Sequence, residues 1–361
     1  MKTYFKKFQN ILVPLFCILI ALIAGGIVIA ILGKNPFTAY YNLLQGCGLA
    51  KKGSYAGHKS QLTDFTSFLD ATTPMFFAAL SVIIALKAGL FNIGVSGQML
   101  AGGFLATVII GYSDLAAYVA KPLVVLIGFV AGALVGALIG FLKHRFNINE
   151  VVSSIMINYI LQFLVSFFIM TYYVDPVSRQ SRLVKQEARL TLCNTVIHDL
   201  KMDLPLGILL ALIGVACIHF LFKKTVLGFE IMAVGNSMKA AEYAGINCGK
   251  TRILSMFLSG GFAGLAGVTY YLGYFGSIQP KVLCSTGFDA IAVALLGNSS
   301  PIGSVFASLL ITVISKGSTY MSSSSGVPAE IASAITGVIL LFSACDIYIK
   351  QKLNAKKEGH K

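Results

Sequence analysis

The stretch that decides the fold is ALKAGLFNIGVSGQMLAGGFLATVII, residues 85–110. It is largely apolar, yet its middle holds Asn92, Ser96 and Gln98 among closely spaced glycines. A continuous membrane helix disfavours this combination, because glycine weakens helices and a buried amide needs hydrogen-bond partners. Non-helical backbone is tolerated at membrane depth where protein surrounds it or where it lines a cavity. The stretch therefore predicts a broken segment within a helical membrane protein.

The composition of the chain also indicates a membrane protein. Of its 361 residues, 56% are hydrophobic and 12% are charged, whereas soluble domains carry about 25% charged residues. Ile11–Leu32 and Pro122–Leu142 lack formal charges, and each is long enough for a span, which takes about 20 residues. The first run exceeds the apolar core of a signal peptide, so we expect it to be retained as a helix.

The apolar runs predict an all-α polytopic membrane protein with about ten transmembrane helices. The segments at 287–298 and 302–317 are short, with Asn298-Ser299-Ser300-Pro301 between them, and each is compatible with a half-helix or a re-entrant piece. The predicted spans are 11–32, 71–88, 95–111, 122–142, 151–171, 204–222, 253–275, 287–298, 302–317 and 329–349.

Basic residues predict the orientation. Lys and Arg gather before residue 11, at 143–145, at 223–252 and after 349. With ten spans these regions share one side, which the positive-inside rule assigns to the cytoplasm together with both termini. The net charge of +14 is explained by these flanks, so we do not expect nucleic-acid binding. The longer loops 33–70 and 171–203 fall on the other side.

Two broken segments resemble each other. Those that begin at Gly89 and Gly287 each run from a glycine with a phenylalanine close behind it, Phe91 or Phe288, through small residues and an amide into an apolar helix. They open the third and eighth spans, so the halves 71–171 and 253–349 would have opposite orientations, as in inverted-repeat transporters. We expect one membrane domain over 1–361, with 223–252 as a cytoplasmic coupling loop.

Catalytic and metal-binding patterns are missing from the sequence. The histidines are dispersed, the cysteines form no CxxC pair, and the run GINCGKT at 245–251 is one residue short of a phosphate-binding loop. We therefore expect no catalytic residue, metal or cofactor on this chain. Acids are scarce in the apolar segments, Asp289 being one near a segment end. This scarcity argues against ion-coupled transport.

Amides and hydroxyls at membrane depth form the predicted substrate pathway. Ser154, Asn158 and Gln162 recur every four residues and so share one helix face. Neutral groups suit a neutral solute that forms hydrogen bonds, while the alternative for each residue is helix packing. The predicted pathway residues are Phe91, Asn92, Ser96, Gln98, Ser154, Asn158, Gln162, Asn298 and Ser299.

Two further patterns concern packing and docking. Glycines recur every four residues in GFVAGALVGALIG, 128–140, and again in GGFAGLAG, 260–267, which predicts close helix contacts. SMKAAEYAGI, 237–246, predicts a short helix that Asn236 or Ser237 caps. On the cytoplasmic side it suits docking of a soluble partner, the alternative being a solvated amphipathic loop.

Three stretches resemble a known family: LKAGLFNIGVSGQ (86–98), NEVVSSIMINYI (149–160) and GFEIMAVGNSMKAAEYAGI (228–246). They are similar to ABC-importer permeases of the branched-chain amino acid, simple-sugar and nucleoside class, and most similar to its nucleoside branch. The resemblance covers about residues 70–350. It implies a ten-helix permease subunit in a bacterial cytoplasmic membrane that imports nucleosides, with simple sugars as the alternative substrate.

The resemblance also implies partners. These are a second, homologous permease subunit, an extracytoplasmic binding lipoprotein, the surrounding lipid, and an ABC ATPase that binds ATP and Mg²⁺. It places Asn92, Gln98 and Asn158 in translocation motifs. Met232 stands where the family usually has Arg, so coupling would depend on other contacts. The residues expected at the ATPase are Gly235, Lys239, Ala240, Ala241, Glu242 and Gly245.

Overall fold

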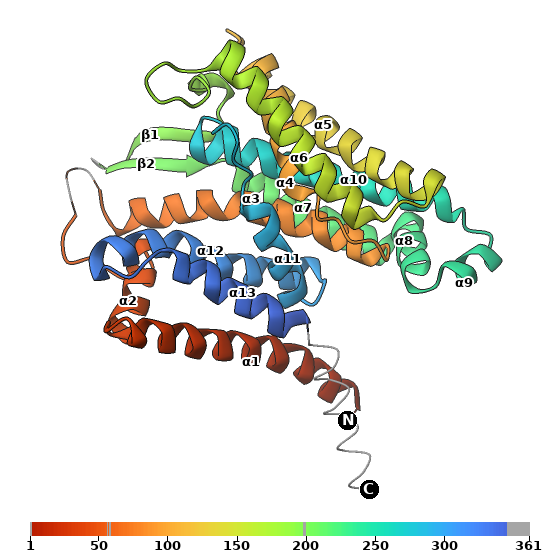
Figure 1. The fold of residues 1–361 in the computed structure, drawn as a ribbon, viewed down its shortest axis with the longest axis horizontal. Coiled ribbons are helices and arrows are strands. Elements are labelled where there is room, and N and C mark those ends of the chain that lie inside the picture. Colours follow the sequence, from red (N-terminus) through yellow and green to blue (C-terminus); the bar gives the residue numbers. More distant parts are fainter. Residues whose placement is uncertain (1, 56, 58, 198–199, 345–361) are drawn as a thin grey trace, which may run out of the picture.

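The computed structural model describes residues 2–344 except 56, 58 and 198–199. The described chain is mostly helical, and several of its long helices run in similar directions (Figure 1). The helices are α1 (Lys2–Ile31), α2 (Pro36–Gly46), α3 (Gln61–Lys87), α4 (Val95–Ala106), α5 (Ala117–Phe146), α6 (Glu150–Phe168), α7 (Gly207–Lys224), α8 (Val226–Asn236), α9 (Met238–Tyr243), α10 (Cys248–Val268), α11 (Thr286–Leu296), α12 (Pro301–Ser325) and α13 (Glu330–Ala344). Shorter turns are η1 (Thr107–Gly111), η2 (Ile169–Tyr173), η3 (Gln186–Ala188) and η4 (Thr269–Phe275).

Within the described residues, six helices are long and apolar enough to cross a membrane: α3, α5, α7, α12, α6 with η2, and α10 with η4. The pair α1 and α2, bent by 116°, adds a seventh span if it crosses as one. The same part of the chain contains four shorter apolar helices, namely α4 with η1, α8, α11 and α13. The segment 287–298 was expected to be short, and the corresponding helix α11 is short. The segment 302–317 was also expected to be short, but α12 continues to Ser325 and has the length of a full span.

The expectation of an all-α chain is wrong at one place. β1 (Thr191–Ile197) and β2 (Leu200–Pro205) pair as an antiparallel hairpin, with a register irregularity between Leu192 and Thr195. Its first strand is rich in β-branched residues, which favour extended structure. β2 also occupies the start of the predicted span 204–222, so α7 begins only at Gly207.

The predicted loop 33–70 is mostly helical. It contains α2, whose N-cap Asn35 accepts hydrogen bonds from the Phe37 and Thr38 N–H groups. It also contains the first turns of α3, where the Ser60 N–H donates to Thr63 Oγ1. Polar residues lower the hydropathy of these turns, so a hydropathy pattern does not predict them as helices. The predicted span 329–349 corresponds to α13, and its residues after 344 lie outside the described part.

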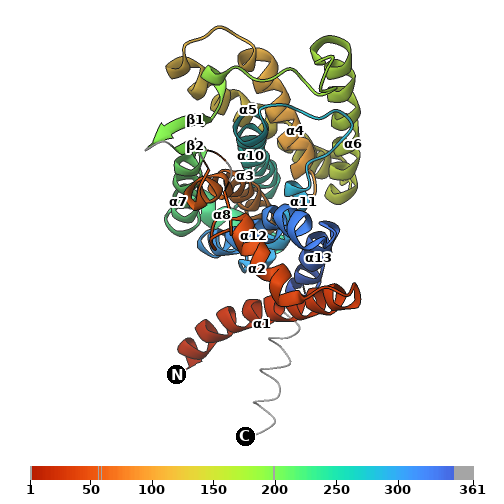
Figure 2. The same ribbon diagram turned by 90° about the vertical axis from the view of Figure 1, so that its left-hand side faces the viewer.

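α3 forms the centre of the molecule. Phe77, Leu80 and Ile83 are fully buried on it, and α7, α10, α11 and α12 pack around it (Figures 1 and 2). An apolar helix buried on all sides is the natural core of such a bundle, because its neighbours rather than lipid surround it.

The glycine stripes are packing faces, as predicted. α5 lies so close to α10 that a Cβ on Gly132 would be 2.2 Å from the Gly260 carbonyl oxygen. A Cβ on Gly264 would be 2.0 Å from the Gly128 oxygen. Only glycine permits this backbone approach, which maximises dispersion contact where no hydrophobic effect drives helices together.

The two ends of the molecule differ. The β1–β2 hairpin and the α2–α3 loop lie at one end, and α8 and α9 lie at the other (Figure 1). α1 begins, and α13 ends, toward the end that carries α8 and α9 (Figure 1).

Candidate functional site

The predicted break lies between α3 and α4, and it is held by buried amides. The Asn92 side-chain amide donates to Gln98 Oε1 (2.9 Å) and to Ser259 Oγ on α10 (2.8 Å). Its oxygen accepts the Gly94 N–H (2.9 Å). Both Asn92 and Gln98 are essentially inaccessible to solvent. These amides therefore satisfy backbone and side-chain groups that the interrupted helix leaves free.

Asn158 supports the same break from α6. Its oxygen accepts the Gly97 N–H (3.0 Å), and its nitrogen donates to the Ile93 carbonyl (3.0 Å). Ser154, one turn earlier, is buried, and Gln162, one turn later, donates to the Lys281 carbonyl (2.6 Å). All three face protein, as their spacing predicts.

The other predicted pathway residues are distributed unevenly. Ser96 joins the buried set and donates to the Cys284 carbonyl (2.9 Å). Phe91 is half-buried beside Asn92. Asn298 and Ser299 lie at the α11–α12 turn, both with positive φ, and Asn298 is exposed. The structure thus brings Asn92, Ser96, Gln98 and Asn158 together and leaves the 298–299 pair elsewhere.

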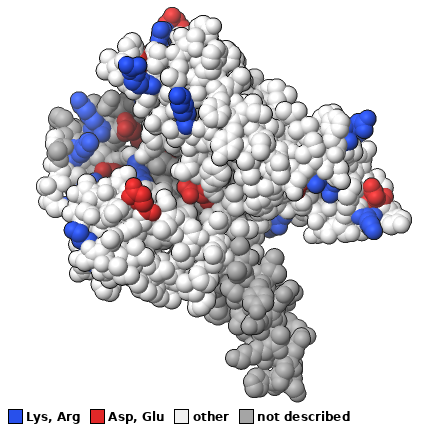
Figure 3. All heavy atoms as spheres, viewed as in Figure 1, with Lys and Arg blue, Asp and Glu red and all other residues white. Residues whose placement is uncertain are grey.

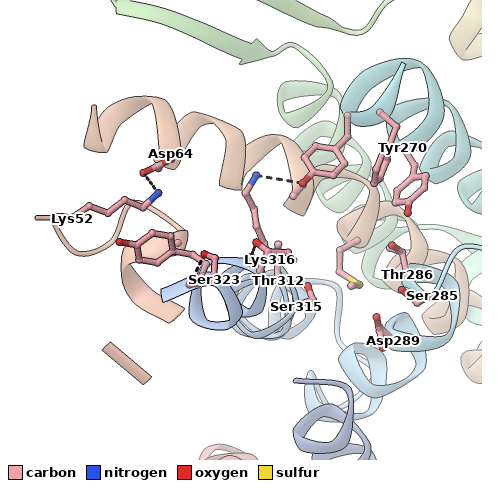
Figure 4. A pocket seen from close by; sticks show the side chains of 17 residues that line it. Lys52, Asp64, Tyr270, Ser285, Thr286, Asp289, Thr312, Ser315, Lys316 and Ser323 are labelled. Carbon is pink, nitrogen blue, oxygen red and sulfur yellow. Dashed lines mark hydrogen bonds and ion pairs between the residues drawn. The ribbon is translucent and has the colours of Figure 1, made fainter. Parts of the chain in front are cut away.

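A cavity of about 480 Å³ lies between α3, α11, α12 and η4, and none of the predicted pathway residues lines it (Figure 4). One wall is a polar stripe along α12, whose members recur every three or four residues and so share one helix face. In the space-filling view the surface is hollowed near α2, α3 and α12, and acidic and basic side chains surround the hollow (Figure 3). The stripe consists of Thr312, Ser315, Lys316, Thr319, Tyr320 and Ser323.

Lys316 is the cation of this stripe. Its ammonium donates to the Ser67 carbonyl (2.8 Å) and hydroxyl, and it lies 4.9 Å from the centroid of the Tyr274 ring. A charge at membrane depth is costly unless it is solvated by protein or faces a water-filled cavity. Lys316 is solvated by the Ser67 groups and also faces the cavity.

An ion pair lies at the outer end of the cavity. The Lys52 ammonium is 2.7 Å from Asp64 Oδ2 and 4.3 Å from the centroid of the Tyr320 ring. Lys52 belongs to the α2–α3 loop, so this end of the cavity is on the side of the hairpin, away from α9 (Figures 1 and 4).

Aromatic rings form the inner wall. Tyr270 and Phe275 have ring centroids 4.8 Å apart, and Tyr274 is also 4.8 Å from Phe275. Tyr270, Phe275 and Ser285 also line a second cavity of about 280 Å³, so these rings separate two hollows. Flat π faces beside hydroxyls can hold a planar polar solute by stacking and hydrogen bonding.

The hydrophobicity pattern missed this cavity. The expected scarcity of acids is wrong for α3, because the helix starts earlier than predicted and includes Asp64 and Asp70. Asp70 is buried and accepts from the Thr191 hydroxyl (2.9 Å). A signal was present in the sequence: Lys316 lies within the predicted span 302–317, and an ionisable residue there is a functional candidate.

The short helix in the 223–252 loop is confirmed as α9. Ser237 is its N-cap and accepts the Ala240 N–H (3.4 Å). Of the residues expected to contact an ATPase, Ala241 is buried against Val234 and Cys248, while Lys239, Ala240, Glu242 and Gly245 are exposed. Tyr243, which no pattern in the sequence indicates, is 94% exposed.

Gly235 lies in the last turn of α8, just before this helix. A Cβ on Gly235 would lie 2.1 Å from the Lys87 carbonyl oxygen and 2.8 Å from the Gly89 nitrogen. Gly235 is therefore only half-exposed and touches the α3–α4 break rather than solvent alone.

Comparison with known families gives the class of protein. The model of the family described as "Branched-chain amino acid transport system / permease component" matches residues 65–344. The chain belongs to this permease family. It is therefore a multi-pass membrane protein and a transport subunit rather than an enzyme.

Individual relatives of the permease cover nearly its whole length. It is 36% identical to the nucleoside ABC transporter permease protein NupB of Lactococcus lactis subsp. cremoris, over 98% of this chain and 95% of that protein. It is 34% identical to the guanosine ABC transporter permease protein NupP of Bacillus subtilis, over 98% and 99%. It is 28% identical to the glucose ABC transporter permease protein TsgB13 of Haloferax volcanii, over 94% and 88%.

Proposed function

We propose that this permease imports nucleosides through the cavity between α3, α11, α12 and η4. The observation that carries the proposal is the pairing of an aromatic wall with a polar stripe in one cavity. A nucleobase stacks on aromatic faces with about 1–3 kcal/mol per base. The sugar hydroxyls then find partners among the hydroxyl and charged groups that line the cavity.

The charges of the lining favour a neutral solute. Lys52 and Lys316 are balanced by Asp64 and Asp289, so no net charge is left for an ionic substrate to neutralise. The relatives named for nucleosides and guanosine support the same substrate class. The relative named for glucose makes a simple sugar the second candidate, since sugars also bind through hydroxyls and aromatic faces.

We further propose that the permease works in an ATP-driven importer. An ABC ATPase with ATP and Mg²⁺ would dock on α9, where Lys239, Ala240, Glu242 and Gly245 are exposed and Ala241 anchors the helix. A second permease subunit and an extracytoplasmic binding lipoprotein would complete the machine. The two permeases are proposed to form a heterodimer.

The proposed topology has ten spans in a bacterial cytoplasmic membrane, with 223–252 and both termini in the cytoplasm. The course of α1 and α13 toward the end that carries α9 supports this assignment. An inverted repeat, 71–171 against 253–349, is supported by α4 and α11. Each is short, and Ser96 and Gly287, the second residues of the two helices, are in contact. The whole chain is proposed to be one membrane domain.

Uptake of radiolabelled guanosine by cells that express the complete importer tests the substrate. Tyr270→Ala removes a ring of the inner wall and should lower uptake at least about tenfold, because stacking energy of this size is lost. Tyr118→Ala, which changes an 82% exposed residue of α5, is the control. If glucose inhibited this uptake as strongly as unlabelled guanosine does, the result would favour a sugar importer instead.

A further inference from the structure

Asp289 stands out among the charged groups of the cavity. It lies in the first turn of α11 and is half-buried. Among the described residues no group donates a hydrogen bond to its carboxylate or forms an ion pair with it, whereas Lys52, Asp64 and Lys316 all have partners. A carboxylate in such a place costs free energy unless donors reach it.

Thr312 shows the same feature on the facing helix. Its side chain is 2% exposed and lines the cavity, and its Oγ1 has no hydrogen-bond partner within the described structure. Buried hydroxyls normally have partners, and one that lacks them needs an explanation. A buried hydroxyl without a partner on α12 and a half-buried carboxylate without a protein partner on α11 therefore border the same hollow (Figure 4).

The chemistry of a carboxylate limits what can satisfy it. An ionised carboxylate only accepts, and its two oxygens suit two neighbouring donors. The first turn of α11 also favours negative charge through the helix dipole. In the proposed function the flat base stacks on the aromatic wall, so the hydrogen-bond donors to the carboxylate come from the sugar. A ribose has a vicinal pair of hydroxyls.

We infer that Asp289 binds the 2′,3′-diol of the nucleoside and that the permease thereby selects ribonucleosides over 2′-deoxynucleosides. Thr312 adds a hydroxyl that accepts from or donates to the same sugar. The inference rests on the proposed nucleoside function and adds the sugar moiety to it. A site built to bond a hydroxyl rejects the analogue that lacks it, because its own polar group is then left unpaired.

Competition for labelled guanosine uptake tests the inference. In the wild-type importer, 2′-deoxyguanosine should compete at least about tenfold less well than guanosine, which is the effect of one lost hydrogen bond to a charged group. In Asp289→Asn the two competitors should differ by less than about twofold, mainly because guanosine competes less well. The binding lipoprotein is the same in both strains, so its own preference contributes equally to the guanosine to 2′-deoxyguanosine ratio of each strain. This contribution cancels when the wild-type ratio is divided by the ratio of Asp289→Asn.

Controls keep the result interpretable. Asp114→Asn changes a carboxylate that is 95% exposed and pairs with Lys185, and it should leave the ratio unchanged. Asp289→Glu keeps the carboxylate and should keep most of the discrimination. If Asp289→Asn transports too little, the ratio is measured by thermal stabilisation of the purified importer with each nucleoside.

Three outcomes would overturn the inference. One is that guanosine and 2′-deoxyguanosine compete equally well in the wild type. Another is that the preference for guanosine over 2′-deoxyguanosine is the same in Asp289→Asn as in the wild type. The third is a variant that changes the preference between guanosine and adenosine but not between ribose and deoxyribose, which would assign Asp289 to the base. A wild-type importer without any nucleoside uptake would instead refute the proposed function.

Discussion

The backbones of Gly89 and Gly235 are in direct contact. A Cβ on Gly89, which has φ +70°, would lie 3.0 Å from the Gly235 Cα. Gly89 lies in the break between α3 and α4, and Gly235 lies in the last turn of α8, just before α9. A shift of α9 would therefore reach the broken segment through backbone, with no flexible side chain between them to absorb it.

This contact predicts the effect of a single methyl group. Gly235→Ala places a carbon against the Lys87 carbonyl, so we expect a loss of about 1–3 kcal/mol in stability and more ATP hydrolysed per guanosine transported. Proteoliposomes with the complete importer report both rates. Gly337→Ala, at a glycine with nothing within 4 Å of the added carbon, is the control. Identical behaviour of the two variants would refute the coupling role of this contact.

Tyr243 is predicted to be the main anchor of the ATPase. Exposed aromatic residues are enriched among interface hot spots, where truncation costs about 2 kcal/mol or more. Tyr243→Ala should weaken co-purification of the ATPase about thirtyfold, with no change in melting temperature, because the ring touches little within the chain. Tyr118→Ala, which changes another strongly exposed tyrosine, at the start of α5, should have no effect. Unchanged affinity for Tyr243→Ala would exclude this residue from the docking surface.

Asn158 is predicted to stabilise the break rather than to select the solute. Asn158→Ala leaves the Gly97 N–H and the Ile93 carbonyl unpaired, at about 1–3 kcal/mol for each orphaned group. Thermal unfolding should therefore occur at a clearly lower temperature, while the ranking of competing nucleosides stays the same. A changed ranking with normal stability would return Asn158 to the substrate pathway.

Energy coupling needs its own test, because Asp70, Asp289 and Lys316 are ionisable groups in or beside membrane segments. If ATP drives import, guanosine uptake should persist when a proton uncoupler is added and cellular ATP is maintained. Uptake that stops at once under these conditions would indicate ion coupling through such groups.

Local signals predicted local features of the fold. The break after Lys87 follows from glycines and amides in an apolar run, and α9 follows from the cap at Ser237 and the helix formers behind it. The close packing of α5 on α10 follows from glycines spaced by four. In each case one stretch of chain contains the whole physical cause.

The cavity has no such local cause. It combines Lys52, Asp64, Tyr270 and Asp289 with the α12 stripe, and only tertiary packing brings these distant segments together. The role of the amides was ambiguous for another reason. An amide such as Asn92 satisfies a substrate or a broken helix equally well, and its partners decide between them. The β1–β2 hairpin was missed because hydropathy patterns of helical length do not detect short strands.

Passage of the nucleoside through this cavity is tested most directly by photolabelling of the assembled importer with 8-azidoguanosine, followed by mass spectrometry of the modified peptides. We predict labels within 270–289 or 312–323 that unlabelled guanosine prevents and glucose does not. Guanosine-protected labels confined to 91–98 or 154–162 would contradict this route, because the solute would then follow the buried amides and not the cavity.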